Sequence, residues 1–416
     1  MNNDDKLVAS RRGFLVGAAG LAGAAAAVRP AAAGVTAANT LAFHGPHQAG
    51  VTTPQQAHVN FATFDITAEK REDVAALMRA WTEAGAALTA GAMLAGPPDD
   101  PASPPTDTGE TRDLSASRLT LTFGLGPGLF AKDGVDRFDL SARRPPAFVD
   151  LPKFVGDQLV EARTGGDLCV QACADDPQVT FHAVRQLARL ADGVAKLRWA
   201  QAGFLSRGGD PKATPRNLMG FKDGTINVAA ADMGKFVWVG DEGGRWMRGG
   251  TYLVARPARI ALEHWDRMKL AFQEQTMGRR KADGAPIGAK DEFTPLDLDA
   301  NDTDGNPLIA ENSHVRLAAP QTNDGAQILR RSYSYDNGLS FVAERWPPWR
   351  QGMELDSGLL FICYQRDPRT GFIKLFDRMS KFDMLNQFVT HIGGGLFACP
   401  GGVPKGRYLA QALFEV

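Results

Sequence analysis

Two segments of the 416-residue chain follow the same pattern, and this repeat constrains the fold more than any other feature. The runs Leu168–Ala174 and Leu359–Gln365 are apolar and strand-like, and each ends in an acidic turn, Asp175-Asp176-Pro177 or Arg366-Asp367-Pro368. Apolar side chains at helical spacing follow both turns. The same order of strand, turn and helix in each half predicts two similar β-α-β units with antiparallel sheets.

The other predicted elements fit an α+β fold of two tandem ferredoxin-like domains, with helices flanking the sheets. Residue type and alternation predict further strands at His58–Ile66, Leu119–Gly124, Thr251–Ala255 and Gly395–Cys399. Helical spacing predicts helices around residues 74–88, over Phe181–Trp199, from Ile260 onward and over Leu375–Val389. Loop-forming residues dominate residues 95–118 and 278–312. We place a flexible lead segment at residues 34–57, the N-terminal domain at 58–225 and the C-terminal domain at 226–416.

Residues 1–33 are typical of an export signal rather than of a folded domain. Arg11 and Arg12 precede an uncharged stretch over Gly13–Val28, and Ala31-Ala32-Ala33 offers a cleavage site of small residues. The paired arginines indicate the Tat pathway, which would deliver the protein to the periplasm or outside the cell. An uncleaved N-terminal anchor is the alternative, although the stretch is shorter than the ~20 residues of a membrane span.

Charge and motifs exclude several classes of function. The formal net charge is −1, so no strong field would draw the chain to nucleic acid. The sequence contains no HExxH, GxSxG or P-loop motif, which removes the commonest signs of zinc proteases, serine hydrolases and nucleoside triphosphatases. The run Gly124–Gly128 lacks the GxGxxG spacing of a dinucleotide site, so we interpret it as a sharp turn after a strand.

The four cysteines and seven histidines form no clear metal motif. Cys169 and Cys173 lie four steps apart on a predicted strand, roughly 13 Å, and a disulfide allows only about 7 Å between Cα atoms. We interpret them as buried, unpaired thiols, with a CxxxC metal site as the weaker alternative. Only His44 and His47 have ligand-like spacing, and both lie in the predicted lead segment.

One glycine-rich segment holds an acid in an unusual setting. Within Thr214–Thr225, Gly220 and Gly224 bracket Asp223 in a GxxDG pattern. Glycine permits positive φ angles and a close approach of the backbone to a flat ligand, so Asp223 could project into a cavity. The alternative is an ordinary turn in which the carboxylate caps its own backbone. The spacing alone leaves both interpretations open.

This segment resembles the GxxDG signature of the dye-decolourising (DyP-type) haem peroxidases. Further stretches resemble segments of that family: Phe123–Pro127, Gly165–Gln171, Asn312–Leu317 and Ile328–Tyr333. The resemblance extends from about Phe61 to Ala412, and with the Tat signal it is greatest to the exported EfeB-like branch, the deferrochelatase/peroxidase of bacterial iron uptake. It implies two ferredoxin-like domains with a haem pocket mainly in the C-terminal half and one haem b per chain.

The resemblance also implies roles for individual residues. His314 is similar to the axial ligand of the haem iron, Asp223 to the distal acid and Arg330 to the distal arginine, with the neighbouring Arg331 as the alternative. The other residues implied at the site are Gly224, Thr225 and Ile226 along the haem edge, Arg316 at a propionate, and one of Asp383, Asn386 and Gln387 as the hydrogen-bond partner of the axial histidine.

The implied activity is the reduction of hydrogen peroxide with oxidation of dyes, phenols or ferrous iron. A carboxylate would move the peroxide proton, and a guanidinium would stabilise the charge on the departing oxygen. Aspartic acids in model peptides ionise near pH 4, so we expect an acidic activity optimum. The alternatives are removal of iron from haem with the porphyrin intact, and non-enzymatic haem carriage. Expected partners are peroxide, a reducing substrate and the Tat machinery, with iron-uptake components and further copies of the chain as additional candidates, and no nucleic acid.

Aromatic residues near Arg330 in the sequence offer sites at which bulky donors could be oxidised. The candidates are Trp346, Trp349, Tyr333 and Tyr335. Simple packing in the core is the alternative, and it is the commoner use of aromatic side chains.

Overall fold

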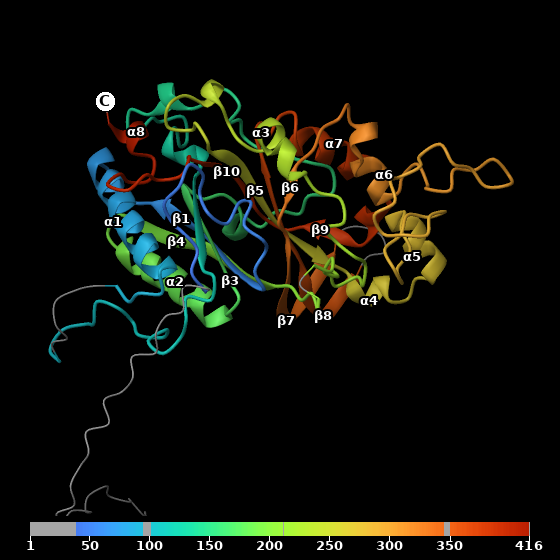
Figure 1. Cartoon of the computed structure of the whole chain (residues 1–416), viewed down its shortest axis with the longest axis horizontal. Helices are drawn as coiled ribbons and strands as arrows, with labels where there is room; N and C mark the ends of the chain where they lie inside the picture. The colour runs from blue at the N-terminus through green and yellow to red at the C-terminus, as the bar shows by residue number, and fades with distance from the viewer. Residues whose placement is uncertain (1–38, 95–100, 211, 345–349, 416) are drawn as a thin grey trace, which may run out of the picture. The chain divides into compact units, whose positions relative to one another are not determined.

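The computed structural model describes residues 39–94, 101–210, 212–344 and 350–415, so the predicted export signal at residues 1–33 lies outside the described residues. Ten strands of the described chain form one antiparallel sheet (Figure 1). The strands are β1 (His58–Ile66), β2 (Thr120–Leu125), β3 (Leu168–Ala174), β4 (Ala195–Phe204), β5 (Thr251–Ile260), β6 (Leu329–Arg330), β7 (Tyr333–Glu344), β8 (Arg350–Gln365), β9 (Val389–His391) and β10 (Gly395–Cys399). The helices are α1 (Arg71–Thr89), α2 (Pro177–Leu190), α3 (Met233–Phe236), α4 (Leu262–Trp265), α5 (Leu270–Met277), α6 (His314–Ala318), α7 (Phe372–Phe382) and α8 (Gln411–Phe414).

Each half of the chain has the strand order of a ferredoxin-like unit. In the N-terminal half the order is β4-β1-β3-β2, and in the C-terminal half it is β10-β5-β8-β7. The first strand of each unit therefore lies between the last and the third strand of that unit. This equivalence confirms the predicted α+β fold with a duplicated ferredoxin-like arrangement.

The two halves share one sheet, a joining that the sequence analysis did not predict. Strand β2 pairs with β10, and β4 pairs with β7, so each edge of one unit meets an edge of the other. Because β8 and β5 also pair, eight strands form a closed ring of hydrogen-bonded neighbours, with β6 on β8 and β9 on β5. Closure satisfies edge strands that would otherwise be exposed.

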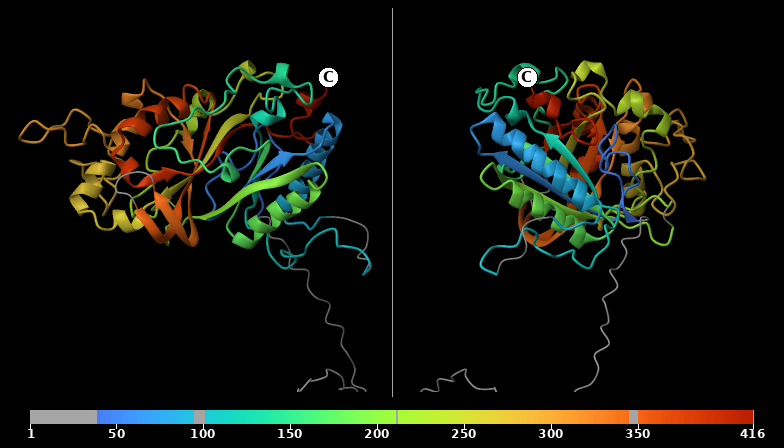
Figure 2. Two further views of the ribbon diagram at one scale, coloured as in Figure 1. Left: turned by 180° about the vertical axis from the view of Figure 1, so that it is seen from behind. Right: turned by 60° about the vertical axis from the view of Figure 1, so that its left-hand side comes forward.

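Helices α1 and α2 lie side by side along the strands of the N-terminal half (Figure 2). The indole of Trp81 in α1 donates to the carbonyl of Leu187 in α2 at 2.9 Å, in the core that both helices cover. Helix α2 begins at Pro177 because the Asp176 side chain accepts from two backbone N–H groups of the first turn. The first copy of the repeated acidic turn is therefore a helix cap, whereas α7 begins at Phe372 without a side-chain cap.

The predicted helix Phe181–Trp199 was wrong in its second part. Helix α2 ends at Leu190, and Gly193 adopts a φ of +79° that turns the chain into β4. From Trp199 onward buried and exposed residues alternate, as they do in a strand with one buried face. Leu197, which lies within the predicted helix, is exposed on β4.

Two predicted helices in the C-terminal half are also shorter than expected. The segment Leu375–Val389 contains the end of α7, a 3₁₀ turn over Met384–Gln387 and the start of β9. The helix stops at Asp383, whose extended backbone lets its side chain accept from Leu385 N instead. The region from Ile260 onward is divided between the short helices α4 and α5.

Residues 39–57 pack into the fold, where we expected a flexible lead segment. Gln48 is buried, and its amide donates to the carbonyls of Phe123 and Pro400 at 3.0 and 2.9 Å. The ring of His47 stacks on that of Trp238 with centroids 3.8 Å apart. This stretch covers one side of the junction between β2 and β10.

Other local predictions are confirmed. All four cysteines are buried and unpaired, including Cys169 and Cys173 on β3. A side chain at Gly126 would lie 2.0 Å from the carbonyl oxygen of Gly166, which explains the glycine in the turn after β2. Among the described residues, no helix combines the length and the apolar character needed to cross a membrane.

Candidate active site

A largely apolar cavity in the C-terminal half brings together segments that are far apart in the sequence. Its walls come from residues 217–228, strands β5 and β8, and helices α6 and α7. The empty volume is about 1800 Å³, including the open space at its mouth. The apolar part of the wall includes Ile260, Leu359, Phe361, Phe376 and Met379. Such walls suit the faces of a large, flat ligand.

His314 stands at the first position of α6, and its side chain is 29% exposed in the cavity wall. Its Nδ1 donates to Oδ2 of Asp383 at 2.7 Å, and Asp383 is buried at the end of α7. With Nδ1 donating, the neutral ring keeps its lone pair on Nε2, which has no hydrogen-bond partner among the described residues. A ring held in this way can offer Nε2 to a metal.

The charge environment of His314 favours the cationic ring. Burial lowers the pKa of His314, but the charge and the hydrogen bond of Asp383 outweigh burial, so the pKa is raised overall. Arg330 and Asp223 also act on this pKa, in opposite directions. Of the three candidates for the histidine's partner, the structure brings Asp383 to it, whereas Asn386 donates to two backbone carbonyls at the end of α7.

Asp223 and Arg330 form an ion pair in the same cavity. Arg330 Nη1 donates to Asp223 Oδ1 at 2.8 Å, and Nη2 donates to the carbonyl of Ile226 at 2.8 Å. Asn217 donates to Asp223 Oδ2 over a long 3.5 Å. Asn227 holds the backbone of Arg330 through both its N–H and its carbonyl, at 2.9 and 2.8 Å. Both members of the pair are partly exposed, so a small molecule entering the cavity can reach them.

Known proteins share the sequence of this chain over most of its length. Residues 48–205 match the family model described as Dyp-type peroxidase, N-terminal, and residues 214–404 match Dyp-type peroxidase, C-terminal. The chain is 38% identical over 384 residues to a dye-decolorizing peroxidase of Thermobifida fusca, covering 88% of this chain and 84% of the relative. It is 36% identical over 386 residues to the deferrochelatase of Escherichia coli K12, covering 90% and 87%. The chain belongs to the Dyp-type peroxidase family.

Solved structures of family members have the same fold as this peroxidase. Ferric DtpA from Streptomyces lividans has a TM-score of 0.81 at 38% identity, covering 91% of this chain and 97% of that one. The DyP-type peroxidase of Cellulomonas bogoriensis has a TM-score of 0.79 at 36% identity, covering 91% and 98%. The family resemblance is thus confirmed, and the protein is a haem peroxidase that uses hydrogen peroxide. The roles of individual residues stay predictions.

Haem fits the groups that line the cavity of the peroxidase. Haem iron requires a ligand such as an imidazole nitrogen with a free lone pair. The porphyrin requires apolar walls, and a propionate requires a cation with an unused hydrogen-bond donor. The cation is Arg279, which is 6% exposed and lines the cavity. Its Nη1 donates to the carbonyls of Gly284 and Glu292, whereas Nη2 is buried and has no partner among the described residues.

Arg316, the predicted propionate partner, does not line the cavity. Its Nη1 donates to the carbonyls of Leu298 and Ile309, at 2.7 and 3.1 Å. Arg331, the alternative to Arg330, is buried elsewhere and donates to Thr53 and Gln56. The structure therefore places Arg330 in the cavity wall, and neither Arg316 nor Arg331 lines the cavity.

The segment that contains Asp223 is held from outside by Glu292. Gly224, Thr225 and Ile226 line the cavity as predicted, and Gly224 has a φ of +128°, which favours glycine. Glu292 accepts from Thr225 Oγ1 at 2.8 Å and forms an ion pair with Lys222. We did not predict Glu292 or Arg279 at the site, because both belong to the long loop between α5 and α6, where no local pattern indicates a contact.

The aromatic candidates near Arg330 do not form surface sites where the structure describes them. Tyr333 and Tyr335 are fully buried in the sheet. Trp346 and Trp349 lie outside the described residues. Packing, the alternative interpretation, accounts for both tyrosines.

Proposed function

We propose that this peroxidase binds one haem b through His314 and reduces hydrogen peroxide with Asp223 and Arg330, while it oxidises dyes, phenols or ferrous iron. The observation that supports this proposal best is that one apolar cavity contains both an oriented imidazole and an acid–base pair. An imidazole oriented by a buried carboxylate shares that cavity with a paired carboxylate and guanidinium. These are the residue types that bind haem iron and that move a proton on peroxide.

Haem, when bound, would supply a redox-active iron with an open coordination position for peroxide. His314 would hold the iron through Nε2, and Asp383 would fix the ring and increase the basicity of that nitrogen. The apolar walls would cover the porphyrin, with Gly224, Thr225 and Ile226 along its edge. Arg279 would pair with a propionate, because its free Nη2 is the buried donor in the wall.

Asp223 would move the proton of peroxide. Arg330 engages Oδ1, so Oδ2, with only the long contact to Asn217, is the oxygen free to take the proton and return it to the departing oxygen. Arg330 would stabilise the negative charge on that oxygen, since a guanidinium stays charged at all working pH values. An acidic optimum follows from a carboxylate base.

The variant Asp223→Asn tests this role. We expect kcat/KM for peroxide to fall by about 10²–10⁴-fold, the usual contribution of a general base. Haem content and the absorption spectrum of the resting enzyme should stay as in the wild type. The matched control is Asp336→Asn, a surface carboxylate on β7 that lies outside the cavity. Wild-type peroxide kinetics in Asp223→Asn would contradict the proposal.

Removal of iron from haem is a second candidate, supported by the 36% identity to a protein named deferrochelatase. Anaerobic incubation of the haem-loaded protein without peroxide distinguishes the two activities. Metal-free porphyrin fluorescence that grows with time would favour iron removal, and a stable haem spectrum with rapid peroxide-dependent dye oxidation would favour the peroxidase. A protein that keeps its haem intact and oxidises no dye would be a haem carrier.

Export by the Tat pathway to the periplasm or beyond is a further part of the proposal. It rests on Arg11 and Arg12 and the uncharged stretch after them. Replacing both arginines with lysine should retain the protein in the cytoplasm of a Tat-competent bacterium. Unchanged export of this double variant would argue against the Tat pathway.

A further inference from the structure

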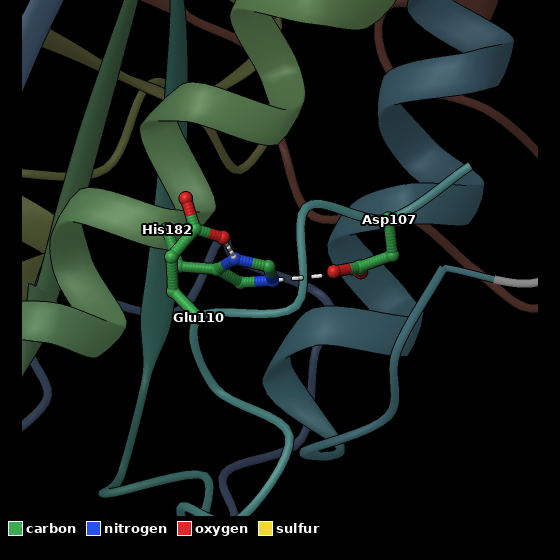
Figure 3. Close-up of side chains that lie close together, drawn as sticks. All are labelled: Asp107, Glu110 and His182. Atoms are coloured by element: carbon green, nitrogen blue, oxygen red, sulfur yellow. Dashed lines mark hydrogen bonds and ion pairs between the residues drawn. The ribbon is translucent and has the colours of Figure 1, made fainter. Parts of the chain in front are cut away.

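A second group of metal-ligating side chains lies in the N-terminal half, and none of its members lines the haem cavity. Asp107 and Glu110 belong to the loop between α1 and β2, and His182 belongs to α2 (Figure 3). Each residue offers one ligand atom, and these atoms lie within 4.8 Å of one another. Acidic clusters are common without a metal, so the hydrogen-bond partners of the His182 ring nitrogens decide whether this group can bind one.

His182 is 2% exposed, and its two ring nitrogens face different carboxylates. Nδ1 lies 2.8 Å from Glu110 Oε2, and Nε2 lies 3.5 Å from Asp107 Oδ2. An ionised carboxylate only accepts hydrogen bonds, so Nδ1 carries a proton. Nε2 is buried and has no hydrogen-bond partner among the described residues. In the neutral ring its lone pair is therefore directed at another acceptor, the oxygen of Asp107.

Asp107 lacks a counter-ion of its own. Its side chain is 7% exposed and accepts from the backbone N–H groups of Leu94 and Gly109, each at 2.8 Å. Within the described chain, His182 is its one neighbour at ion-pair distance that could carry positive charge. A buried carboxylate that faces a buried nitrogen lone pair is unfavourable. A proton on Nε2 or a metal cation between the two atoms would each remove this conflict, and the zinc experiments below distinguish the two.

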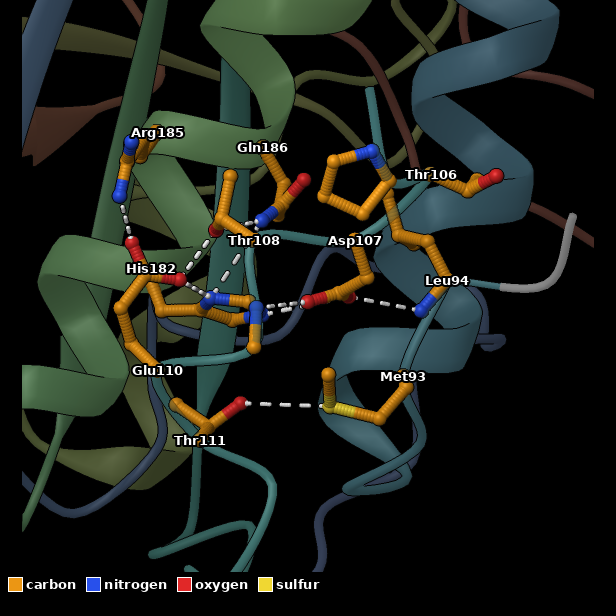
Figure 4. Close-up of polar contacts among 12 residues, drawn as sticks. Met93, Leu94, Thr106, Asp107, Thr108, Glu110, Thr111, His182, Arg185 and Gln186 are labelled. Atoms are coloured by element: carbon orange, nitrogen blue, oxygen red, sulfur yellow. Dashed lines mark hydrogen bonds and ion pairs between the residues drawn. The ribbon is translucent and has the colours of Figure 1, made fainter. Parts of the chain in front are cut away.

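Glu110 is held in place on the other side of the ring. It accepts from Thr108 and Arg185, and Gln186 reaches Thr108 from the next turn of α2 (Figure 4). With Thr108 and Arg185 holding it, Glu110 keeps Oε2 at 2.8 Å from Nδ1 and orients the imidazole, as carboxylates do behind metal-bound histidines.

We propose that His182 Nε2 and Asp107 Oδ2 bind a divalent transition-metal cation of the zinc class, with Glu110 orienting the imidazole. At metal–ligand distances of ~2.0–2.2 Å, their 3.5 Å separation corresponds to an angle of roughly 115° at the metal, close to tetrahedral. Water would complete the coordination. The cation would fasten the loop around Asp107 to α2, a structural role separate from the haem.

Zinc titration of the haem-loaded protein, followed by calorimetry and by metal analysis after dialysis, tests the site. We expect one zinc per chain in addition to the haem iron. Asp107→Asn and His182→Gln should each weaken zinc binding by at least about tenfold, and Glu110→Gln by about 10–100-fold, the usual effect of losing an orienting partner. His58→Gln, which removes a histidine at the start of β1, is the matched control and should bind zinc like the wild type.

Amide hydrogen exchange gives a second readout that a purely structural defect would not reproduce. Zinc should slow exchange over residues 107–111 in the wild type and leave it unchanged in Asp107→Asn, whose shape is nearly the same. The haem absorption band and circular dichroism report whether each variant is folded. The absence of saturable zinc binding by the wild type would overturn the proposal, and so would wild-type binding by folded Asp107→Asn or His182→Gln.

Discussion

Arg279 and Arg316 make similar backbone hydrogen bonds, yet they occupy different surroundings. Each donates from Nη1 to two backbone carbonyls. Arg279 follows the end of α5, and Arg316 lies in α6. Arg279 differs because it lines the cavity and keeps Nη2 buried without a partner. A buried donor of this kind is costly unless a ligand satisfies it, and a propionate would do so.

Haem release therefore tests the two arginines against each other. Arg279→Leu should accelerate transfer of haem to apomyoglobin by about 10–100-fold, the equivalent of the ~1.5–3 kcal/mol of a charged hydrogen bond. Arg316→Leu should leave the rate of haem transfer unchanged even if it destabilises the loop. Equal rates for Arg279→Leu and the wild type would remove Arg279 from the proposed propionate site.

Single residues with a motif around them could be predicted, and residues without one could not. The GxxDG pattern and the segment around His314 indicated Asp223 and the histidine, and the structure brings both to one cavity. The family resemblance implied Arg316 as a propionate partner, but Arg316 does not line the cavity, whereas Arg279 does. Spatial proximity in this part of the chain is set by a loop without regular structure, so no sequence pattern indicated that Arg279 lines the cavity.

At the scale of elements, the loop between α5 and α6 is a support for the Asp223 segment. Glu292 is buried, forms an ion pair with Lys222 and accepts from Thr225, one on each side of Asp223 and Gly224. Burial raises the pKa of Glu292, but hydrogen bonds from Lys222, Thr214 and Thr225 outweigh it, so the pKa is lowered overall. The folded state therefore binds this proton less tightly than the unfolded chain.

This shift fixes the sign of a pH effect on stability. A lowered carboxyl pKa contributes stability above the unfolded value of 4.5, and that contribution is lost as the pH falls through the folded value. Glu292→Gln should cost roughly 2–3 kcal/mol near neutral pH, and the difference from the wild type should shrink below pH 4.5. Denaturant unfolding at several pH values measures this difference in the free energy of unfolding, with Glu69→Gln at an exposed position as the control. A difference that grows in acid would contradict the account.

The ends of elements were hardest to predict where apolar residues keep a helical spacing beyond the end of the helix and into the next strand. In the sequence, the helical spacing of α2 continues through Ala191, Val194 and Leu197. In the structure, the helix ends at Leu190, and Gly193 turns the chain into β4. Local spacing cannot register the pairing of β4 with β1, which depends on residues more than a hundred positions away. Strands with apolar residues on both faces, such as β3 and β10, were predicted at their observed bounds.

At the scale of the whole described chain, the closed ring of strands couples the two ferredoxin-like units. Their duplication was visible in the sequence, because the acidic turn and its helix recur in each half. The joining of their edges through β2 with β10 and β4 with β7 was not visible, since single pairings such as Leu125 with Ala398 leave no pattern.

Because the two units share a sheet, we expect that a substitution that destabilises one unit also lowers the unfolding temperature of the other. Leu121→Ala in β2, a fully buried position of the N-terminal half, should cost about 2–5 kcal/mol. Heat-induced loss of the haem absorption band, which reports on the C-terminal half, should shift down together with the circular dichroism transition. Two separate transitions, with the haem band unshifted, would show that the units unfold independently.

The central claim is that His314 binds the haem iron, and a cavity variant tests it most directly. In His314→Gly, the protein should no longer show the absorption and electron paramagnetic resonance spectra of a histidine-bound haem. Added imidazole should restore these spectra by occupying the space beside Asp383. Wild-type spectra in His314→Gly without imidazole, at one haem per chain, would contradict the account.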